Sequence, residues 1–193
     1  MGTIQRKLNA VREHWFQILI ACLALALAFG LGMYVQAQRA EAEAEDDLYW
    51  ACVNMDEHLS SPEIWLRLPY FQALESPMED PGMKAEMAYV RRWAARILEA
   101  ELAYSLEKPD VPVTHAYLRA LAEELLGSSC PDAPSAARLF TLCEPLDRAL
   151  ETCASQEMLL PALEAELNTP AGQETLTLLE ITEDLLTTTQ GGT

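Results

Sequence analysis

Residues 15–35 read WFQILIACLALALAFGLGMYV, in which Gln17 is the only strongly polar side chain. An α-helix of these 21 residues is roughly 31 Å long at ~1.5 Å per residue, which matches the ~30 Å hydrocarbon core of a bilayer. Trp15 and Tyr34 lie at the two ends, where aromatic rings favour the membrane–water interface. A soluble core helix of this composition would need apolar cover on every side, which the acidic remainder of the chain does not supply. The run therefore predicts a transmembrane helix over residues 15–36.

A cleaved signal peptide is the competing interpretation of the same run. Basic residues precede it, and Val35-Gln36-Ala37 resembles a signal-peptide cleavage site. However, the apolar core of a signal peptide usually has only ~7–15 residues, and cleavage here would cut a continuing helical pattern. The sequence favours an uncleaved anchor that contacts the bilayer through residues 15–36.

Charged residues on the two flanks predict the orientation of this helix. Arg6, Lys7 and Arg12 precede it, whereas residues 41–47 after it contain five acids. Because basic residues stay on the cytoplasmic side, we expect residues 1–14 to be a cytoplasmic tail and residues 37–193 to lie outside. The sequence contains no Asn-x-Ser/Thr glycosylation site, which favours a bacterial periplasm over a eukaryotic lumen. The predicted location is a bacterial inner membrane, crossed once.

The charge balance excludes one large class of partner. The 193 residues carry a formal net charge of −17, and nucleic-acid binding depends on Lys and Arg that neutralise phosphates. We therefore expect no nucleic-acid partner. An acidic surface is compatible with solubility and with basic or cationic partners.

The segment after the membrane run predicts a stalk helix over residues 37–59. Its apolar residues recur with a mean step close to 3.6, which leaves an acidic opposite face. The members of this stripe are Ala37, Ala40, Ala44, Leu48, Ala51 or Cys52, Met55 and Leu59. This periodicity indicates that the membrane helix continues outward.

Proline and glycine positions divide the predicted domain, residues 60–188, into helices. Ser61-Pro62 resembles a cap that starts a short helix disturbed at Pro69, and Asp80-Pro81 starts a long helix to about Leu106. A further helix is expected from Thr114 to Gly127. The remaining helices are expected at about 133–142, 145–153, 156–167 and 170–188, the last with Thr169-Pro170 as its start.

No window predicts a strand, so the expected fold class is all-α: a transmembrane helix continuing into a stalk, followed by an irregular helical bundle. A period of ~34 residues typical of tetratricopeptide repeats is not present, and a degenerate repeat is the structural alternative. The tail, residues 189–193, is expected to be disordered.

The chain shows no pattern typical of catalysis, cofactor binding or a metal site. Its three histidines are His14, His58 and His115, and no pair of them has metal-ligand spacing on a helix. Asp56-Glu57-His58 could supply ligands, but a solvated helix face is the simpler interpretation. Nucleophile and phosphate-binding motifs do not occur either. We expect a protein that is not an enzyme and takes no cofactor.

Two groups of residues are candidates for protein contacts. Ala24, Ala28 and Gly32 recur every four residues in the membrane run, where small side chains let helices approach closely, so a homo-oligomer is possible. The second group is aromatic and basic, as interface anchors often are. Its members are Trp65, Tyr70, Phe71, Arg92 and Trp93. Core packing is the competing explanation for both groups.

Four cysteines lie beyond the membrane run: Cys52, Cys130, Cys143 and Cys153. An even number in an oxidising compartment indicates disulfides. If Pro145 separates two short antiparallel helices, Cys130 and Cys153 meet at the open end, and Cys143 at the turn reaches Cys52. Cys143 and Cys153 are about 15 Å apart if the helix only kinks, so that pairing is excluded in both arrangements.

Together these observations predict a non-catalytic single-pass membrane protein that is an accessory or scaffold subunit of a membrane or envelope complex. About 14 cytoplasmic residues are too few to form an output domain. The alternative is a periplasmic ligand-sensing bundle that signals through a partner. An exposed apolar patch around Trp65 would favour the scaffold, and a deep aromatic pocket would favour the sensor.

Overall fold

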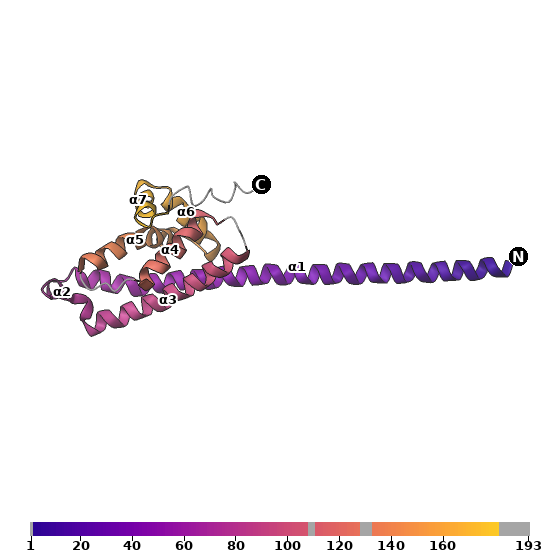
Figure 1. Cartoon of the computed structure of the whole chain (residues 1–193), viewed down its shortest axis with the longest axis horizontal. Coiled ribbons are helices and arrows are strands. Elements are labelled where there is room, and N and C mark those ends of the chain that lie inside the picture. Colours follow the sequence, from indigo (N-terminus) through magenta and orange to yellow (C-terminus); the bar gives the residue numbers. More distant parts are fainter. Residues whose placement is uncertain (1, 108–110, 128–132, 182–193) are drawn as a thin grey trace. The chain divides into compact units, whose positions relative to one another are not determined.

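The computed structural model describes residues 2–107, 111–127 and 133–181, and its regular elements there are all helical (Figure 1), which confirms the all-α class. The α-helices are α1 (Gly2–Leu66), α2 (Pro69–Gln72), α3 (Pro81–Glu107), α4 (Val113–Gly127), α5 (Ala133–Thr152), α6 (Leu159–Leu167) and α7 (Pro170–Leu178). Two short 3₁₀ helices are η1 (Pro77–Glu79) and η2 (Gln156–Met158). The chain forms two compact units, residues 1–43 and residues 44–193.

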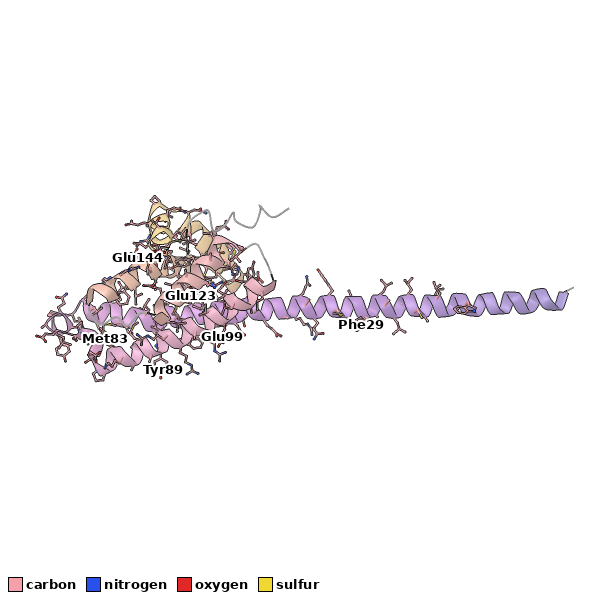
Figure 2. The ribbon with its side chains drawn as sticks, in the orientation of Figure 1. Phe29, Met83, Tyr89, Glu99, Glu123 and Glu144 are labelled. Atoms are coloured by element: carbon pink, nitrogen blue, oxygen red, sulfur yellow. The ribbon has the colours of Figure 1, made fainter. Side chains whose placement is uncertain are left out.

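The first unit is the apolar part of α1. Its large side chains are exposed to the surroundings, with Leu25 and Phe29 each 71% exposed, and Phe29 projects from the ribbon in Figure 2. Over the described residues this is the one helix that is long and apolar enough to cross a membrane. Such a helix near the N-terminus fits a single-pass anchor or a signal sequence.

The second unit has a single hydrophobic core, to which α1 itself contributes. Leu48, Cys52, Met55 and Leu59 are at most 6% exposed and belong to that core. The 3.6-residue stripe is therefore confirmed from Leu48 to Leu59, whereas Ala37, Ala40 and Ala44 are exposed. Residues 37–59 continue the apolar helix, as the predicted stalk does. The second half of this segment packs inside the bundle because the stripe finds apolar partners on the later helices.

The longest helix of the second unit, α3, begins where the sequence predicts. The Asp80 carboxylate accepts hydrogen bonds from the backbone N–H of Gly82 (2.8 Å) and Met83 (3.3 Å), which caps the helix. α3 lies alongside α1 (Figure 1), and the pair is antiparallel because Trp65 is next to Gly82 whereas His58 bonds Glu86. α4 ends at Gly127, as predicted, and begins at Val113, one residue before the predicted Thr114.

Pro62 does not start a new helix, so the predicted cap at Ser61 is wrong. Helix α1 continues through this proline to Leu66. A proline inside a helix removes one backbone hydrogen bond and crowds the carbonyl four residues earlier. Pro62 is buried and follows the buried Leu59, so packing on the bundle offsets the local cost.

The predicted hairpin of helices 133–142 and 145–153 is also wrong, because α5 is one helix that contains Pro145. Proline disturbs the carbonyls of the turn before it. Here the buried Tyr117 hydroxyl of α4 donates a 2.7 Å hydrogen bond to the Leu142 carbonyl in that turn. A side chain 25 residues away therefore supports the continuous helix.

The last helix begins as predicted and ends earlier. The Thr169 side chain accepts a hydrogen bond from the Gly172 N–H (3.1 Å), and Pro170 occupies the first turn of α7. α7 stops at Leu178, and Glu180 has a positive φ of 58°, so the predicted end at 188 is wrong. The predicted tail, residues 189–193, lies outside the described residues.

Candidate functional site

An aromatic tip forms where α1 ends and α2 begins; we define it as residues 64–71. The Trp65 and Phe71 rings stack with centroids 5.9 Å apart, and Tyr70 meets Phe71 edge-on at 5.0 Å. Pro69 starts α2 directly after the turn, which folds the chain back so that these rings meet. Three of the five interface candidates thus form one cluster.

The aromatic tip exposes an unusual amount of apolar surface. Ile64 is 59% exposed, Leu68 45% and Tyr70 64%. Single exposed apolar side chains are common on soluble proteins, but neighbouring ones mark interaction surfaces. This local concentration makes the aromatic tip a candidate docking surface.

Arg92 and Trp93 do not join the aromatic tip. Trp93 is partly buried against the core, and Arg92 is exposed on α3. Gly82, which is next to Trp65, lies ten residues earlier on the same helix, a distance of about 15 Å along the axis. The interface prediction for these two residues therefore stays untested.

A groove of ≈ 580 Å³ lies beside the aromatic tip, between residues 56–66 of α1 and residues 137–148 of α5. Asp56 and Glu63 line it from α1, and Glu144 and Asp147 line it from α5. Leu66, Arg67 and Gln72 line the part next to the tip.

The charged side chains of the groove are unevenly paired. Arg67 forms an ion pair with Glu63, and Arg148 forms one with Glu144 at 2.9 Å; Glu144 is labelled on α5 in Figure 2. Asp56 and Asp147 also line the groove. Among the described residues, no basic side chain forms a hydrogen bond or an ion pair with either of them. Burial, followed by the repulsion of Asp147, Glu151 and Glu63, raises the pKa of Asp56 to about 6.

Replacing Asp56 by asparagine is expected to stabilise the protein near neutral pH by about 1–2 kcal/mol, after allowance for solvent screening. The folded state holds the Asp56 proton more tightly than the unfolded chain, whose pKa is near 3.8. Stability is therefore lost as the pH rises from about 4 to about 6, and Asp56→Asn removes that loss. Urea unfolding of the full chain near pH 4 and near pH 7.5 measures the difference.

Glu157→Gln is the matched control, because Glu157 is an exposed acid outside the groove. Its effect is expected to stay within about 0.5 kcal/mol at both pH values. The prediction is that the variant exceeds the wild type in free energy of unfolding by more near pH 7.5 than near pH 4. An equal difference at the two pH values would contradict it.

A second cluster of polar side chains is buried between α3 and α4. Glu101 is 1% exposed and His115 5%, and His115 Nδ1 lies 3.1 Å and 2.9 Å from the two Glu101 carboxylate oxygens. The Tyr104 ring stacks on His115 with centroids 3.8 Å apart. Burial raises the pKa of Glu101, and the contact with His115 opposes that rise. The pair joins two helices inside the core rather than lining the groove.

The other histidine of the domain, His58, has a local partner. Its Nδ1 lies 2.7 Å from a Glu86 carboxylate oxygen, and its ring stacks on Tyr89 with centroids 4.7 Å apart. His58 thus helps to hold α1 against α3. In the part of the chain that the structure describes, no three potential ligands come together as a metal site would require.

Cys52 and Cys143 are buried, and Cys153 is half-buried; all three are free thiols in the structure. Cys52 and Cys143 both influence Tyr117, so the fold brings them to the same buried region. Burial raises the pKa of each thiol. Because both thiols are free, the predicted Cys52–Cys143 bond is not formed in the structure.

The other predicted pairing, Cys130 with Cys153, includes a residue outside the described ones. The hairpin at Pro145, on which this pairing depends, is not formed. α5 is 20 residues long, about 30 Å, and Cys153 follows its far end. The Cys153 thiol instead points toward the Leu150 carbonyl at 3.4 Å.

The proposed membrane-packing residues lie in the first unit. Ala24, Ala28 and Gly32 are exposed, and no atom lies within 4 Å of a Cβ placed at Gly32. The surface is open to another helix, but no described contact tests the prediction.

The groove was missed at the level of sequence because it depends on how α1 meets α5. One signal was available: Asp56 and Glu63 are seven residues apart, and Glu144, Asp147 and Glu151 recur at steps of three and four, so each helix carries an acidic stripe. Nothing in the sequence states that these two stripes face each other.

Comparisons with known proteins give no relative from which to transfer a function. No family model, no curated protein and no solved structure matches the chain.

Proposed function

We propose that this chain is a non-catalytic, single-pass membrane protein whose domain, residues 44–193, binds other membrane or envelope proteins as a scaffold or accessory subunit. The observation that carries the proposal is the aromatic tip, in which Trp65, Tyr70 and Phe71 cluster and Ile64, Leu68 and Tyr70 are about half or more exposed. Buried aromatic anchors dominate the energy of many protein interfaces.

The proposal includes a membrane topology. The apolar helix serves as an uncleaved anchor, and the basic residues before it keep the N-terminus in the cytoplasm. The aromatic tip then lies outside the cytoplasm, in a bacterial periplasm. A protein that acts by binding a partner needs no signalling domain of its own.

An oxidising compartment would also permit a Cys52–Cys143 disulfide, which we retain as part of the proposal. Its support is that both thiols lie around Tyr117. Because a raised pKa slows the reaction of a buried thiol, the bond would form before the core closes.

A ligand-sensing bundle is less well supported. The groove is open and lined by charged side chains, with Phe140 its one aromatic residue among those described. A sensor of small apolar ligands would present a more enclosed pocket with aromatic walls.

Loss of the exposed apolar side chains of the tip is expected to abolish partner binding without unfolding the domain. A photo-activated cross-linker at the exposed Gln72 should join the wild-type chain to a defined partner in intact cells. Leu68→Ser with Tyr70→Ser should reduce that product at least tenfold, because hot-spot aromatic residues contribute about 2 kcal/mol or more.

Leu178→Ser provides the control, because Leu178 is 41% exposed against 45% for Leu68 but lies on α7. It should leave cross-linking unchanged. Equal losses from both substitutions, or no cross-linked product with the wild-type chain, would contradict the proposed function.

A further inference from the structure

The groove between α1 and α5 has a charge imbalance that a ligand could correct. Both of its described arginines are already engaged, Arg67 with Glu63 and Arg148 with Glu144. Asp56 and Asp147 line the same groove from opposite helices and repel each other. A cation between them would replace this repulsion with attraction.

The groove also has an apolar floor. Leu59 is buried, and Leu66 and Phe140 are half-buried where they line it. A metal ion or a fully hydrated cation gains nothing from such a surface. A lysine or arginine side chain does, because its methylene stem packs on apolar atoms while its charged head reaches carboxylates.

The groove is continuous with the aromatic tip along the chain. Leu66 and Arg67 line the groove, and Trp65 and Leu68 on either side belong to the tip. The lining residues of α1, 56 to 66, cover about 15 Å of helix, which accommodates several residues of a bound segment. A segment lying along this line would meet carboxylates first and exposed apolar side chains next.

We propose that the groove between α1 and α5 is the site that selects the partner: it binds a peptide segment of that partner in which lysine or arginine residues alternate with apolar ones. The basic side chains lie between Asp56 and Asp147, and the apolar residues pack on Leu66, Phe140 and the aromatic tip. This inference rests on the proposed function, since it assigns the chemistry of the partner segment.

The raised pKa of Asp56 agrees with this assignment. Asp56 keeps a carboxylate where burial, and then the neighbouring acids, make its ionisation unfavourable. Residues that lower stability without serving the fold are typical of binding sites. The bound basic segment would relieve the same repulsion that the free domain carries.

Binding of a synthetic peptide to the full chain tests the inference. The protein is held in nanodiscs of uncharged phosphatidylcholine, so that a basic peptide gains nothing from the lipid. The probe is a fluorescein-labelled peptide in which lysines alternate with leucines, and its counterpart has glutamate at every lysine. Fluorescence anisotropy should show binding of the lysine peptide and none of the glutamate peptide.

The variants separate a built site from general acidity. Asp56→Asn with Asp147→Asn should weaken binding about tenfold, since two partly exposed charge pairs together contribute about 1.4 kcal/mol. Glu157→Gln with Glu174→Gln removes the same charge from exposed acids outside the groove and should change binding less than twofold. Because Asp56→Asn is expected to stabilise the fold, weaker binding would not reflect unfolding.

Three results would overturn the inference. They are equal weakening by both double variants, no binding of the lysine peptide, and displacement of the peptide by spermidine at equal charge concentration, which would indicate a site for small amines. None of these results alters the cross-linking at Gln72. Conversely, binding of the lysine peptide without any cross-linked partner would contradict the scaffold function. The groove would then still be a site for basic peptides.

Discussion

Replacing His115 by alanine is expected to lower the free energy of unfolding by about 3–5 kcal/mol, because it leaves a buried carboxylate without its partner. Glu101 is 1% exposed, and both of its oxygens lie within 3.1 Å of His115 Nδ1. The variant also loses the stack between Tyr104 and His115. A loss of this size is a large part of the 5–15 kcal/mol that is typical of a folded domain.

The pH dependence of the variant follows from the raised pKa of Glu101. Without His115 that pKa rises further, so the folded variant holds the Glu101 proton to higher pH than the unfolded chain does. Stability of His115→Ala should therefore fall as the pH rises above the unfolded value near 4.5. The defect should be smallest in acid, where Glu101 is neutral in both states.

Urea unfolding of the full chain in detergent, followed by tryptophan fluorescence, measures these differences. The informative comparison is between the single variant His115→Ala and a double variant that also carries Glu101→Gln. The double variant lacks the buried carboxylate, so it should recover at least about 1 kcal/mol of the lost free energy of unfolding. A single variant that loses less than about 1 kcal/mol, or a double variant no more stable than the single one, would contradict a stabilising contact between His115 and the Glu101 carboxylate.

Gly172→Ala is expected to cost about 2–3 kcal/mol, the range for forcing an extra methyl group into a packed site. A Cβ at this position would lie 2.3 Å from the Glu166 carbonyl oxygen and 2.6 Å from Leu167 Cα. Both are backbone atoms of the α6 end, so no side chain can rotate away. The first turn of α7 would have to move outward, which loosens the Thr169 cap and exposes Leu176.

Gly127→Ala is the matched control for that substitution. Gly127 ends α4 without a positive φ, and no atom lies within 4 Å of the place that an alanine methyl group would take. Alanine is favoured over glycine in helices by up to ~1 kcal/mol, so this variant should be neutral or slightly stabilising. Thermal unfolding of the two variants should therefore shift in different directions, and equal shifts would contradict a specific steric role for Gly172.

Sequence signals were reliable where the local chain decides the outcome. Pro81 and Thr169 start helices because proline and an N-cap residue act within one turn, and both positions are confirmed. The apolar run and the stripe from Leu48 to Leu59 were also readable, because each depends on composition or period alone.

The same signals failed where distant residues override the local chain. Pro62 and Pro145 would interrupt isolated helices, but both lie inside continuous ones. The Tyr117 hydroxyl bonds the Leu142 carbonyl beside the second proline, a contact that no local pattern announces. The groove was hidden for the same reason, because it exists only once α1 and α5 are side by side.

The participation of α1 in the core has a consequence for how the protein is made. Leu59 is synthesised about 80 residues before Leu139 of α5, with which it shares the core. At ~5–20 residues per second, the apolar stripe of α1 waits about 4–16 s for α5, one of the helices that cover it. During biogenesis this stripe is a stretch that chaperones must shield, and a nascent chain stalled before α5 would expose it to aggregation.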